Sequence, residues 1–365
     1  MQSKVNLERA YENLREHLDK YPIGFPTSKT GAGIRILKHL FEPEEAVIAT
    51  MLTDKFETLE KIYERSKLDM NISELKEKLD TMGSKGAIHY KIVDGEKHYA
   101  NAYLVIGMYE YQLNRLTPEF LEDMSEYADN EFGIELFGTK ISQFRTIPVE
   151  KSVTAEHSLP TYEELEKIVN NSSGPYVLIE CICRKAHKMG DETCKVTSRK
   201  ETCFGMGEMA EMYVNEGWGR EVTRQEALET LRMNQEEGLV FQAENIIDPK
   251  FICSCCGCCC GILTNLKEFP KTVDFFSTNY YAQINADDCV GCGTCIDACQ
   301  IDAIKMKNDI SKVNKRRCIG CGNCVPICPE QAIQLMKKDK VEIPPDNEDE
   351  LFAKILAKKI EIKSS

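Results

Sequence analysis

The alternation of apolar and polar positions in the first 110 residues predicts a set of helices followed by a hairpin. Asn71 and Glu74 have the spacing of a capping box at the start of the last of these helices. Asp94-Gly95 lies between two alternating segments, where a two-residue turn is expected. The predicted elements are a polar first helix, two helices divided at Pro43, helices within 56–68 and 71–86, and a hairpin over 87–103.

Beyond residue 140 the pattern alternates between strands and helices. Thr223 and Glu226 again have the spacing of a capping box, and Gly238 is placed to end the helix that they begin. The predicted elements are a strand in 144–153, a helix in 162–172, a strand in 175–180, two helices in 207–238, and a final helix after Pro344-Pro345. This order of elements predicts an α+β fold with several domains.

Three helices and a hairpin near the N-terminus are similar to a winged helix, so we expect a winged-helix-like domain there. In a winged helix that binds DNA, the helix predicted within 71–86 would be the recognition helix. Its surface carries nearly equal numbers of acidic and basic residues. These are Glu74, Lys76, Glu77, Lys78 and Asp80. Because binding to phosphates usually needs a net basic stripe, a role in protein docking is favoured over DNA binding.

The whole chain is acidic, with a formal net charge of -13 and a pI of about 5.2. This charge argues against nucleic acid as the main partner and suits docking on a basic patch of another protein. The first residues are polar, and no apolar run approaches the length that spans a membrane. We therefore expect a cytoplasmic protein with no membrane span.

The cysteines change this picture, because the chain has 18 of them and all lie between Cys181 and Cys328. In a cytoplasmic chain such a set is expected to bind metal or carry out redox chemistry rather than form disulfides. The cysteine-free N-terminal half and the cysteine-rich C-terminal half should therefore have different roles.

Two runs near the C-terminal end share the spacing C-x2-C-x2-C-x3-C. The first spans Cys289–Cys299, and the second spans Cys318–Cys328, 29 residues further on, which indicates an internal duplication. Thiolates are soft ligands that suit iron and sulfide, and the glycines within each run let backbone N–H groups approach a negatively charged cluster. Both runs resemble those of the bacterial two-cluster ferredoxins.

This resemblance implies two 4Fe-4S clusters, with the fourth cysteine of each run bound to the cluster of the other run. The implied ligands are Cys289, Cys292, Cys295 and Cys328 for one cluster, and Cys318, Cys321, Cys324 and Cys299 for the other. Tyr281 would pack beside a cluster. Gln300 departs from the family, which often has proline there, and this loosens a turn without removing a ligand. A pair of zinc sites is the alternative, but zinc modules use four ligands in two separated pairs.

The other ten cysteines form two groups in the middle of the chain. The groups are Cys181, Cys183, Cys194 and Cys203, then Cys253, Cys255, Cys256, Cys258, Cys259 and Cys260. We expect the intervening helices to bring the groups together into one metal pocket with at least one further 4Fe-4S cluster. Two clusters, one cluster with spare cysteines, or a non-cubane cluster at Cys255-Cys256-Gly257 are all allowed. Zinc is less favoured, because one ion needs only four ligands.

The segments "CICR", "GWGREVTRQEAL", "EEGLVFQAENI" and "FICSCCGCCCGIL" resemble a family of multi-cluster 4Fe-4S ferredoxin-like proteins from anaerobic bacteria and archaea. The resemblance implies a cysteine-rich middle domain between a winged-helix-like part and a two-cluster ferredoxin. The expected segments are 1–110 for the N-terminal helix and winged-helix-like domain, 111–180 for an α/β bridge, 181–270 for a mixed helical iron-sulfur domain, 279–338 for the two-cluster ferredoxin domain, and 339–365 for a helical tail.

Three charged or titratable residues near the middle cysteines have two interpretations each. Arg184 and Arg220 could pair with cluster charge or with carboxylates. His187 could be a ligand, but a solvated loop histidine is favoured where thiolates are plentiful.

We therefore expect a multi-cluster electron carrier, not an enzyme in itself, that moves single electrons between partner oxidoreductases containing flavin or iron-sulfur centres. One alternative is a redox-sensing winged-helix regulator whose binding to DNA or protein responds to the state of a cluster. Another is an enzyme whose middle cluster reduces a small molecule, which would need an open coordination site and a pocket.

Overall fold

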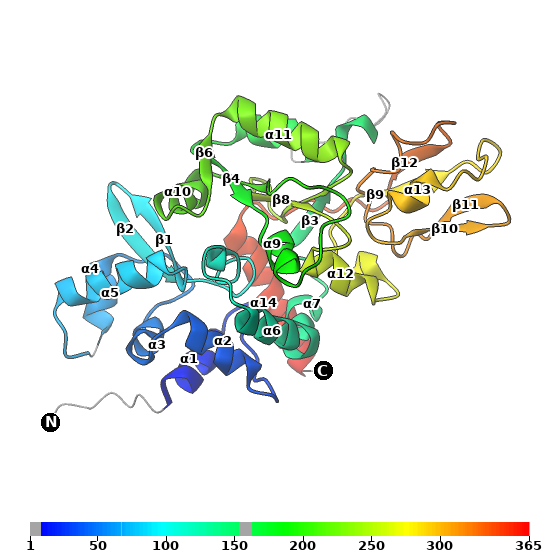
Figure 1. Cartoon of the computed structure of the whole chain (residues 1–365). Helices are drawn as coiled ribbons and strands as arrows, with labels where there is room; N and C mark the ends of the chain where they lie inside the picture. Colours follow the sequence, from blue (N-terminus) through cyan, green and yellow to red (C-terminus); the bar gives the residue numbers. More distant parts are fainter. Residues whose placement is uncertain (1–8, 67, 153–162, 365) are drawn as a thin grey trace. The chain divides into compact units, whose positions relative to one another are not determined.

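The computed structural model describes residues 9–66, 68–152 and 163–364. The chain divides into two compact units, which are described separately here (Figure 1). The first unit contains the N-terminal part up to Thr139, with Asn215–Trp218 and the chain from Ile355 onward. The second unit contains Lys140–Val214 and Gly219–Lys354. No helix in the described part of the chain is both long and apolar enough to cross a membrane.

The first unit is mainly helical, with one hairpin. Its α-helices are α1 (Ala10–Leu18), α2 (Ala32–Leu40), α3 (Pro43–Ala49), α4 (Leu59–Arg65), α5 (Ile72–Ser84), α6 (Pro118–Tyr127) and α7 (Gly133–Phe137). The strands are β1 (Ile88–Val93) and β2 (Glu96–Asn101), and the short η2 (Glu110–Gln112) and the π-helical η3 (Ala128–Phe132) complete the set. The predicted first helix extends in part outside the described residues.

Local signals placed the helix starts and the hairpin turn of this unit correctly. Asn71 accepts hydrogen bonds from the backbone N–H groups of Ser73 and Glu74, and the Glu74 side chain accepts one from the N–H of Asn71, which completes the capping box. Between β1 and β2, Asp94 and Gly95 both have positive φ, as the tight hairpin turn requires. Helices followed by a hairpin fit the expected order of elements, and the winged-helix assignment itself stays a prediction.

The lysines of α5 are engaged in ion pairs. Lys76 Nζ lies 2.6 Å from Asp80 Oδ2, and Lys78 Nζ lies 2.6 Å from Glu44 Oε2. Lys97 of the hairpin also pairs with Asp80, at 3.1 Å. The balanced charge expected from the sequence is thus neutralised locally, which disfavours contact with a nucleic-acid backbone.

The second unit is built on a six-stranded antiparallel sheet in the order β3-β7-β8-β5-β4-β6. The strands are β3 (Phe144–Ile147), β4 (Tyr176–Glu180), β5 (Glu201–Met206), β6 (Arg220–Val222), β7 (Val240–Glu244) and β8 (Phe251–Cys255). The helices are α8 (Leu165–Asn171), α9 (Ile182–Met189), α10 (Gly207–Asn215), α11 (Arg224–Glu236) and α12 (Gly261–Lys267), with short η4 (Glu150–Ser152) and η6 (Thr272–Asp274). The middle of the chain was expected to be mixed helical, so its central sheet is a finding of the structure.

The two faces of this sheet differ in chemistry. Phe204 and Met206 of β5 and Ile252 of β8 belong to a buried hydrophobic core that also takes in residues of α8 and α11. Because side chains alternate along a strand, Cys203 of β5 and Cys253 of β8 point to the opposite face. One face therefore holds the hydrophobic core, and the other carries thiols.

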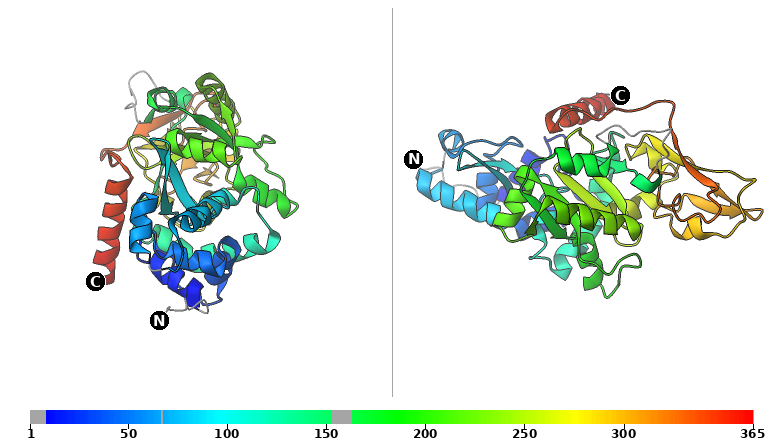
Figure 2. Two further views of the ribbon diagram at one scale, coloured as in Figure 1. Left: turned by 90° about the vertical axis from the view of Figure 1, so that its left-hand side faces the viewer. Right: turned by 90° about the horizontal axis from the view of Figure 1, so that it is seen from above.

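The C-terminal part of this unit consists of two small antiparallel sheets, coloured orange in Figures 1 and 2. β9 (Tyr280–Ile284) pairs with β12 (Ile333–Lys337), and β10 (Ile304–Lys307) pairs with β11 (Ile310–Val313). The short α13 (Thr294–Asp297) lies within the first cysteine run, and α14 (Glu348–Ser364) ends the described chain.

Candidate metal centres

Six of the middle cysteines gather on the thiol-bearing face of the sheet, and we call them the six-thiol group. They are Cys181, Cys183, Cys203, Cys253, Cys255 and Cys260. Cys203 comes from β5, and Cys253 and Cys255 come from alternate positions of β8, which pairs with β5. The remaining three lie at or next to helix starts, since Cys181 and Cys260 are the N-cap residues of α9 and α12.

Each thiol of this group interacts with two others, so that the six form a closed ring. In order around the ring, the members are Cys181, Cys183, Cys260, Cys255, Cys253 and Cys203, and Cys203 returns to Cys181. The hydrogen bonds from Cys183 and Cys203 hold the pKa of Cys181 well below its ordinary value, whereas the pKa values of the other five are raised by hydrogen bonding and burial. A metal cluster bound here would therefore displace protons from most of the ring.

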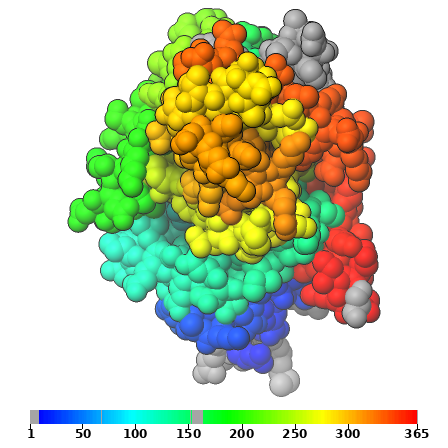
Figure 3. Space-filling view, turned by 90° about the vertical axis from the view of Figure 1, so that its right-hand side faces the viewer, coloured from blue at the N-terminus to red at the C-terminus, as the bar shows by residue number. Residues whose placement is uncertain are grey.

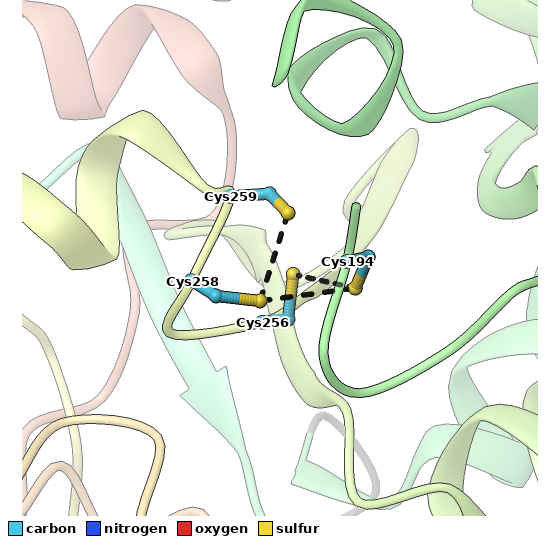
Figure 4. A group of neighbouring side chains, drawn as sticks. All are labelled: Cys194, Cys256, Cys258 and Cys259. Atoms are coloured by element: carbon cyan, nitrogen blue, oxygen red, sulfur yellow. Dashed lines mark hydrogen bonds between the residues drawn. The ribbon is translucent and has the colours of Figure 1, made fainter. Parts of the chain in front are cut away.

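The other four middle cysteines form a separate and more compact set, which we call the four-thiol group. They are Cys194, Cys256, Cys258 and Cys259, and their sulfur atoms all lie within 4.8 Å of one another (Figure 4). Cys194 Sγ is 3.6 Å from Cys256 Sγ and 3.8 Å from Cys258 Sγ, and Cys258 Sγ is 3.6 Å from Cys259 Sγ. The ten middle cysteines thus separate into six and four, a division that does not follow their order in the chain.

Backbone N–H groups point at the sulfurs of the four-thiol group. Those of Val196 and Thr197 each donate to Cys194 Sγ at 3.5 Å, and that of Lys195 donates to Cys258 Sγ at 3.5 Å. Burial opposes ionisation of Cys194, but hydrogen bonds from the N–H groups of Thr197 and Val196 and from the thiols of Cys256 and Cys258 together lower the pKa of this thiol. The loop around residue 194 is therefore arranged to stabilise thiolates.

Arg184 lies beside both groups. Its side chain is 8% exposed, and Nη1 donates to Ser254 O at 3.2 Å and approaches Cys256 Sγ at 3.7 Å. Burial alone would lower the pKa of Arg184, but the charges of Cys181, Cys203 and Cys256 raise it above its ordinary value. Its Nε is buried and has no hydrogen-bond partner among the described atoms, so one N–H remains for a group held by the thiols.

The two other residues weighed in the sequence have ordinary surface partners. Arg220 pairs with Glu201 at 2.9 Å and with Glu226 at 2.7 Å, which is the carboxylate alternative. Glu226 is thus drawn to Arg220, while only Thr223 supplies a cap to α11. His187 lies in α9, not in the expected loop, and its Nε2 is 2.8 Å from Glu192 Oε2.

The cysteines of the first run line one cavity together with the last cysteine of the second run. Cys289, Cys292, Cys295 and Cys328 all border it, and so do apolar side chains of β9 and β12. Cys292 is exposed, and neighbouring Val290 is 65% exposed. The chain segment that contains the two runs, yellow-orange to orange, lies on the face shown in Figure 3. This set matches the ligands implied for one cluster and lies at the protein surface.

The cysteines of the second run are more deeply buried. The pKa of Cys324 is raised well above its ordinary value by burial first and then by the charges of Cys321, Cys318, Cys299 and Cys295. Burial also raises the pKa of Cys321 to about 12. The glycines at equivalent positions of the two runs, Gly291 and Gly320, have nearly the same positive φ (69° and 66°), as the duplication predicts.

Several contacts join the two cysteine runs to the rest of this unit. The backbone N–H of Val149 donates to Cys321 O at 2.9 Å, and Asn323 Nδ2 donates to Gly238 O at 2.6 Å. Gln300 Oε1 accepts a hydrogen bond of 2.8 Å from the N–H of Gly257, which lies inside the four-thiol group. The residue that departs from the ferredoxin pattern therefore has a role, because its side chain contacts the middle cysteine segment.

Tyr281 of β9 is partly buried, and Lys315 Nζ lies 4.0 Å from the centre of its ring. This cation-π contact is the interaction that the structure shows for the ring, and packing of Tyr281 against a cluster stays a prediction.

Sequence reasoning did not foresee the division of the middle cysteines or the position of Arg184 between the two groups. The sequence did contain a signal for the division into two groups. In "FICSC", Cys253 and Cys255 alternate with Ile252 and Ser254, which is the pattern of a strand whose two cysteines share one face. The position of Arg184 depends on how α9 packs on the sheet, and no local pattern encodes that.

Comparison with protein families supports the interpretation of the C-terminal part. Two models, each described as a 4Fe-4S dicluster domain, match residues 282–335 and 317–356. The first match contains all eight cysteines of the two runs. No curated protein and no solved structure matches the chain. The C-terminal region of this chain is therefore that of an iron-sulfur, ferredoxin-like protein.

Proposed function

We propose that the chain is a multi-cluster iron-sulfur electron-transfer protein that carries single electrons between partner oxidoreductases. The observation that carries the proposal is the gathering of thiols in the second unit into a surface set, a buried set and the middle groups, with hydrogen bonds from the C-terminal cysteine runs to Gly238 and Gly257 of the middle segment. Ferredoxin-type clusters are one-electron carriers, and the protein sets their potentials through burial and hydrogen bonds.

The two C-terminal clusters take the ligands implied by the ferredoxin resemblance. Backbone N–H groups of the kind that tune such clusters are in place, because Ala282 N donates to Cys318 Sγ at 3.3 Å and Ala303 N donates to Cys299 Sγ at 3.2 Å. The six-thiol group holds the further cluster of the middle domain. Its fit is supported by the donor set of soft thiolates and by the free Nε of Arg184.

The contacts give an order to these centres. Asn323 of the second run contacts the middle segment at Gly238. Gln300, which contacts it at Gly257, follows directly on Cys299, an implied ligand of the second-run cluster. The first run has the exposed Cys292 and Val290. Electrons therefore pass between the six-thiol group and the buried second-run cluster, and exchange with a partner at the first-run cluster.

A regulatory role through DNA is not favoured. The lysines Lys76 and Lys78 of α5 are held by carboxylates at 2.6 Å, and the whole chain is acidic. We propose instead that the N-terminal unit docks a partner protein or another subunit.

The test is iron, acid-labile sulfide and EPR on anaerobically purified full-length protein. We expect about eight irons from the two C-terminal clusters and a further contribution from the middle cluster, at least about four irons. A Cys203→Ser, Cys253→Ser double variant should lose only that further iron, whereas Cys292→Ser should perturb the C-terminal signals instead. About eight irons in both the wild type and the double variant would contradict a cluster in the six-thiol group.

The proposed exchange site has its own test. Val290→Glu places a charge beside the first-run cluster without touching a ligand, so electron exchange with an external protein donor should slow while the iron content stays unchanged. Val341→Glu, at a position 36% exposed outside the cysteine runs, is the matched control. Equal rates for the two variants would argue against exchange at the first run.

A further inference from the structure

We propose that the four-thiol group is a mononuclear structural zinc site, distinct from the iron-sulfur clusters of the same chain. The site consists of Cys194, Cys256, Cys258 and Cys259, and its occupant is a divalent zinc ion bound by four thiolates. The inference does not depend on the electron-transfer role, because it concerns a separate set of ligands.

The spacing of the sulfurs carries the argument. A zinc ion with four bonds of about 2.3 Å in tetrahedral geometry places its sulfur ligands about 3.8 Å apart. Three of the six sulfur–sulfur distances, 3.6, 3.8 and 3.6 Å, agree with this value, and all six lie within 4.8 Å. The group is therefore the right size for a single ion.

A cubane cluster needs a wider arrangement. Four irons and their sulfides lie between its ligands, so the cysteine sulfurs are held roughly 6 Å apart. Among the residues described by the structure, the eight cysteines of the two ferredoxin runs do not form a set with all sulfurs within 4.8 Å, and the four-thiol group does. Among the described cysteines, the compact spacing therefore belongs to the four-thiol group.

The surroundings of the group suit a closed structural site. Three backbone N–H groups donate to its sulfurs at 3.5 Å, and Arg184 Nη1 approaches Cys256 Sγ at 3.7 Å. Four thiolates around zinc carry a net charge of about -2, which these donors and the guanidinium offset. Zinc has no redox chemistry at such a site, so its role here is structural.

The ion would tie together two segments that are far apart in sequence. Cys194 lies in the loop after α9, and the other three ligands lie in the turn between β8 and α12. This turn also presents Gly257, whose N–H donates to Gln300 Oε1 at 2.8 Å and whose carbonyl accepts from Lys267 Nζ at 2.9 Å. Zinc would therefore fix the surface on which the second-run cluster is docked.

The proposal is tested by metal analysis of full-length protein purified anaerobically. We expect one zinc per chain in the wild type and its loss in Cys258→Ser, with the iron content of the C-terminal clusters retained. Cys203→Ser, in the six-thiol group, is the matched control and should lose iron but keep zinc. Protein produced with cobalt should show the absorption of tetrahedral Co²⁺ thiolate, and Cys258→Ser should abolish it.

A second variant covers the case in which Cys258→Ser does not fold. Cys194→His preserves a ligand that zinc accepts, so the zinc should remain, with a changed cobalt spectrum. Wild-type protein without zinc would overturn the proposal, and so would loss of iron rather than zinc from Cys258→Ser. A single iron at the group would show a mononuclear site but refute its assignment to zinc.

Discussion

Replacing Arg184 with glutamine would remove a buried positive charge that lies beside the cysteine groups of the middle domain. The guanidinium is 8% exposed, and its pKa is raised by the charges of Cys181 and Cys203 of the six-thiol group and by Cys256. Reduction of a cluster adds a negative charge to the same place. Loss of the guanidinium should therefore make reduction of the middle cluster harder.

The size of the effect follows from Coulomb's law. For a charge about 7 Å from the cluster and an effective dielectric constant near 20, the interaction is about 2 kcal/mol. For a one-electron couple this corresponds to a reduction potential lower by roughly 100 mV. Glutamine can keep one hydrogen bond to Ser254 O, so the change is mainly one of charge.

The assay is an anaerobic redox titration followed by EPR, on protein whose iron content equals that of the wild type. Arg184→Lys keeps the charge and should retain most of the wild-type potential. Arg220→Gln is the control, because Arg220 pairs with Glu201 and Glu226 on the surface. A middle-cluster potential unchanged in Arg184→Gln, or lowered equally in Arg184→Lys, would refute the electrostatic reasoning.

Three further predictions follow from individual contacts. Gly320 has a positive φ, and Gly320→Ala would place a Cβ 2.5 Å from the backbone oxygen of Tyr280, so we expect loss of the second-run cluster, about four irons. Gly217→Ala is the control, because Gly217 has a similar φ with open space around it, and this variant should keep its full iron content. His89 is partly buried, and this burial lowers its pKa to about 4, so the imidazole is neutral in the folded chain and protonated first in the unfolded chain. Acidification from about pH 6.5 to about pH 4 should lower the free energy of unfolding by up to about 3 kcal/mol. In acid unfolding followed by the fluorescence of the single tryptophan, His89→Gln should therefore unfold at a lower pH than the wild type. Equal unfolding midpoints for the two proteins would exclude this histidine as the cause. Gly257→Ala would place a Cβ 2.1 Å from the backbone oxygen of Gln300 and so push the middle segment away from the chain next to Cys299. Magnetic coupling between the middle and second-run clusters should therefore weaken. Gly261→Ala, with no neighbour within 4 Å, should leave the coupling unchanged.

Much of the local structure could be predicted from the sequence because its signals are local. The capping box at Asn71, the turn at Asp94-Gly95 and the duplicated cysteine runs each depend on a few consecutive residues. The 4Fe-4S dicluster matches to residues 282–335 and 317–356 confirm the ferredoxin-like character of the C-terminal region.

The arrangement of the middle cysteines could not be predicted in the same way, because it depends on strand pairing. Cys203 and Cys253 become neighbours only when β5 pairs with β8, and they are 50 positions apart in the chain. Cys255 and Cys256 are adjacent in sequence but belong to different groups, since consecutive side chains of an extended segment point in opposite directions. Proximity in the chain was therefore a poor guide to shared ligation.

The burial of the six-thiol group also bears on the order in which the protein matures. Its thiols come from two paired strands and from residues at helix starts, and Cys181, Cys203, Cys255 and Cys260 are buried in the finished fold. For the cluster proposed in the six-thiol group, iron and sulfide would have to reach these thiols while β8 is still free to move, so loading of this centre would accompany folding of the sheet. Cys292 of the first run is exposed and can receive its cluster from a delivery protein after the chain has folded. The proposed function thus implies that maturation proceeds from the inside outward, with the buried middle centre loaded before the exposed first-run centre.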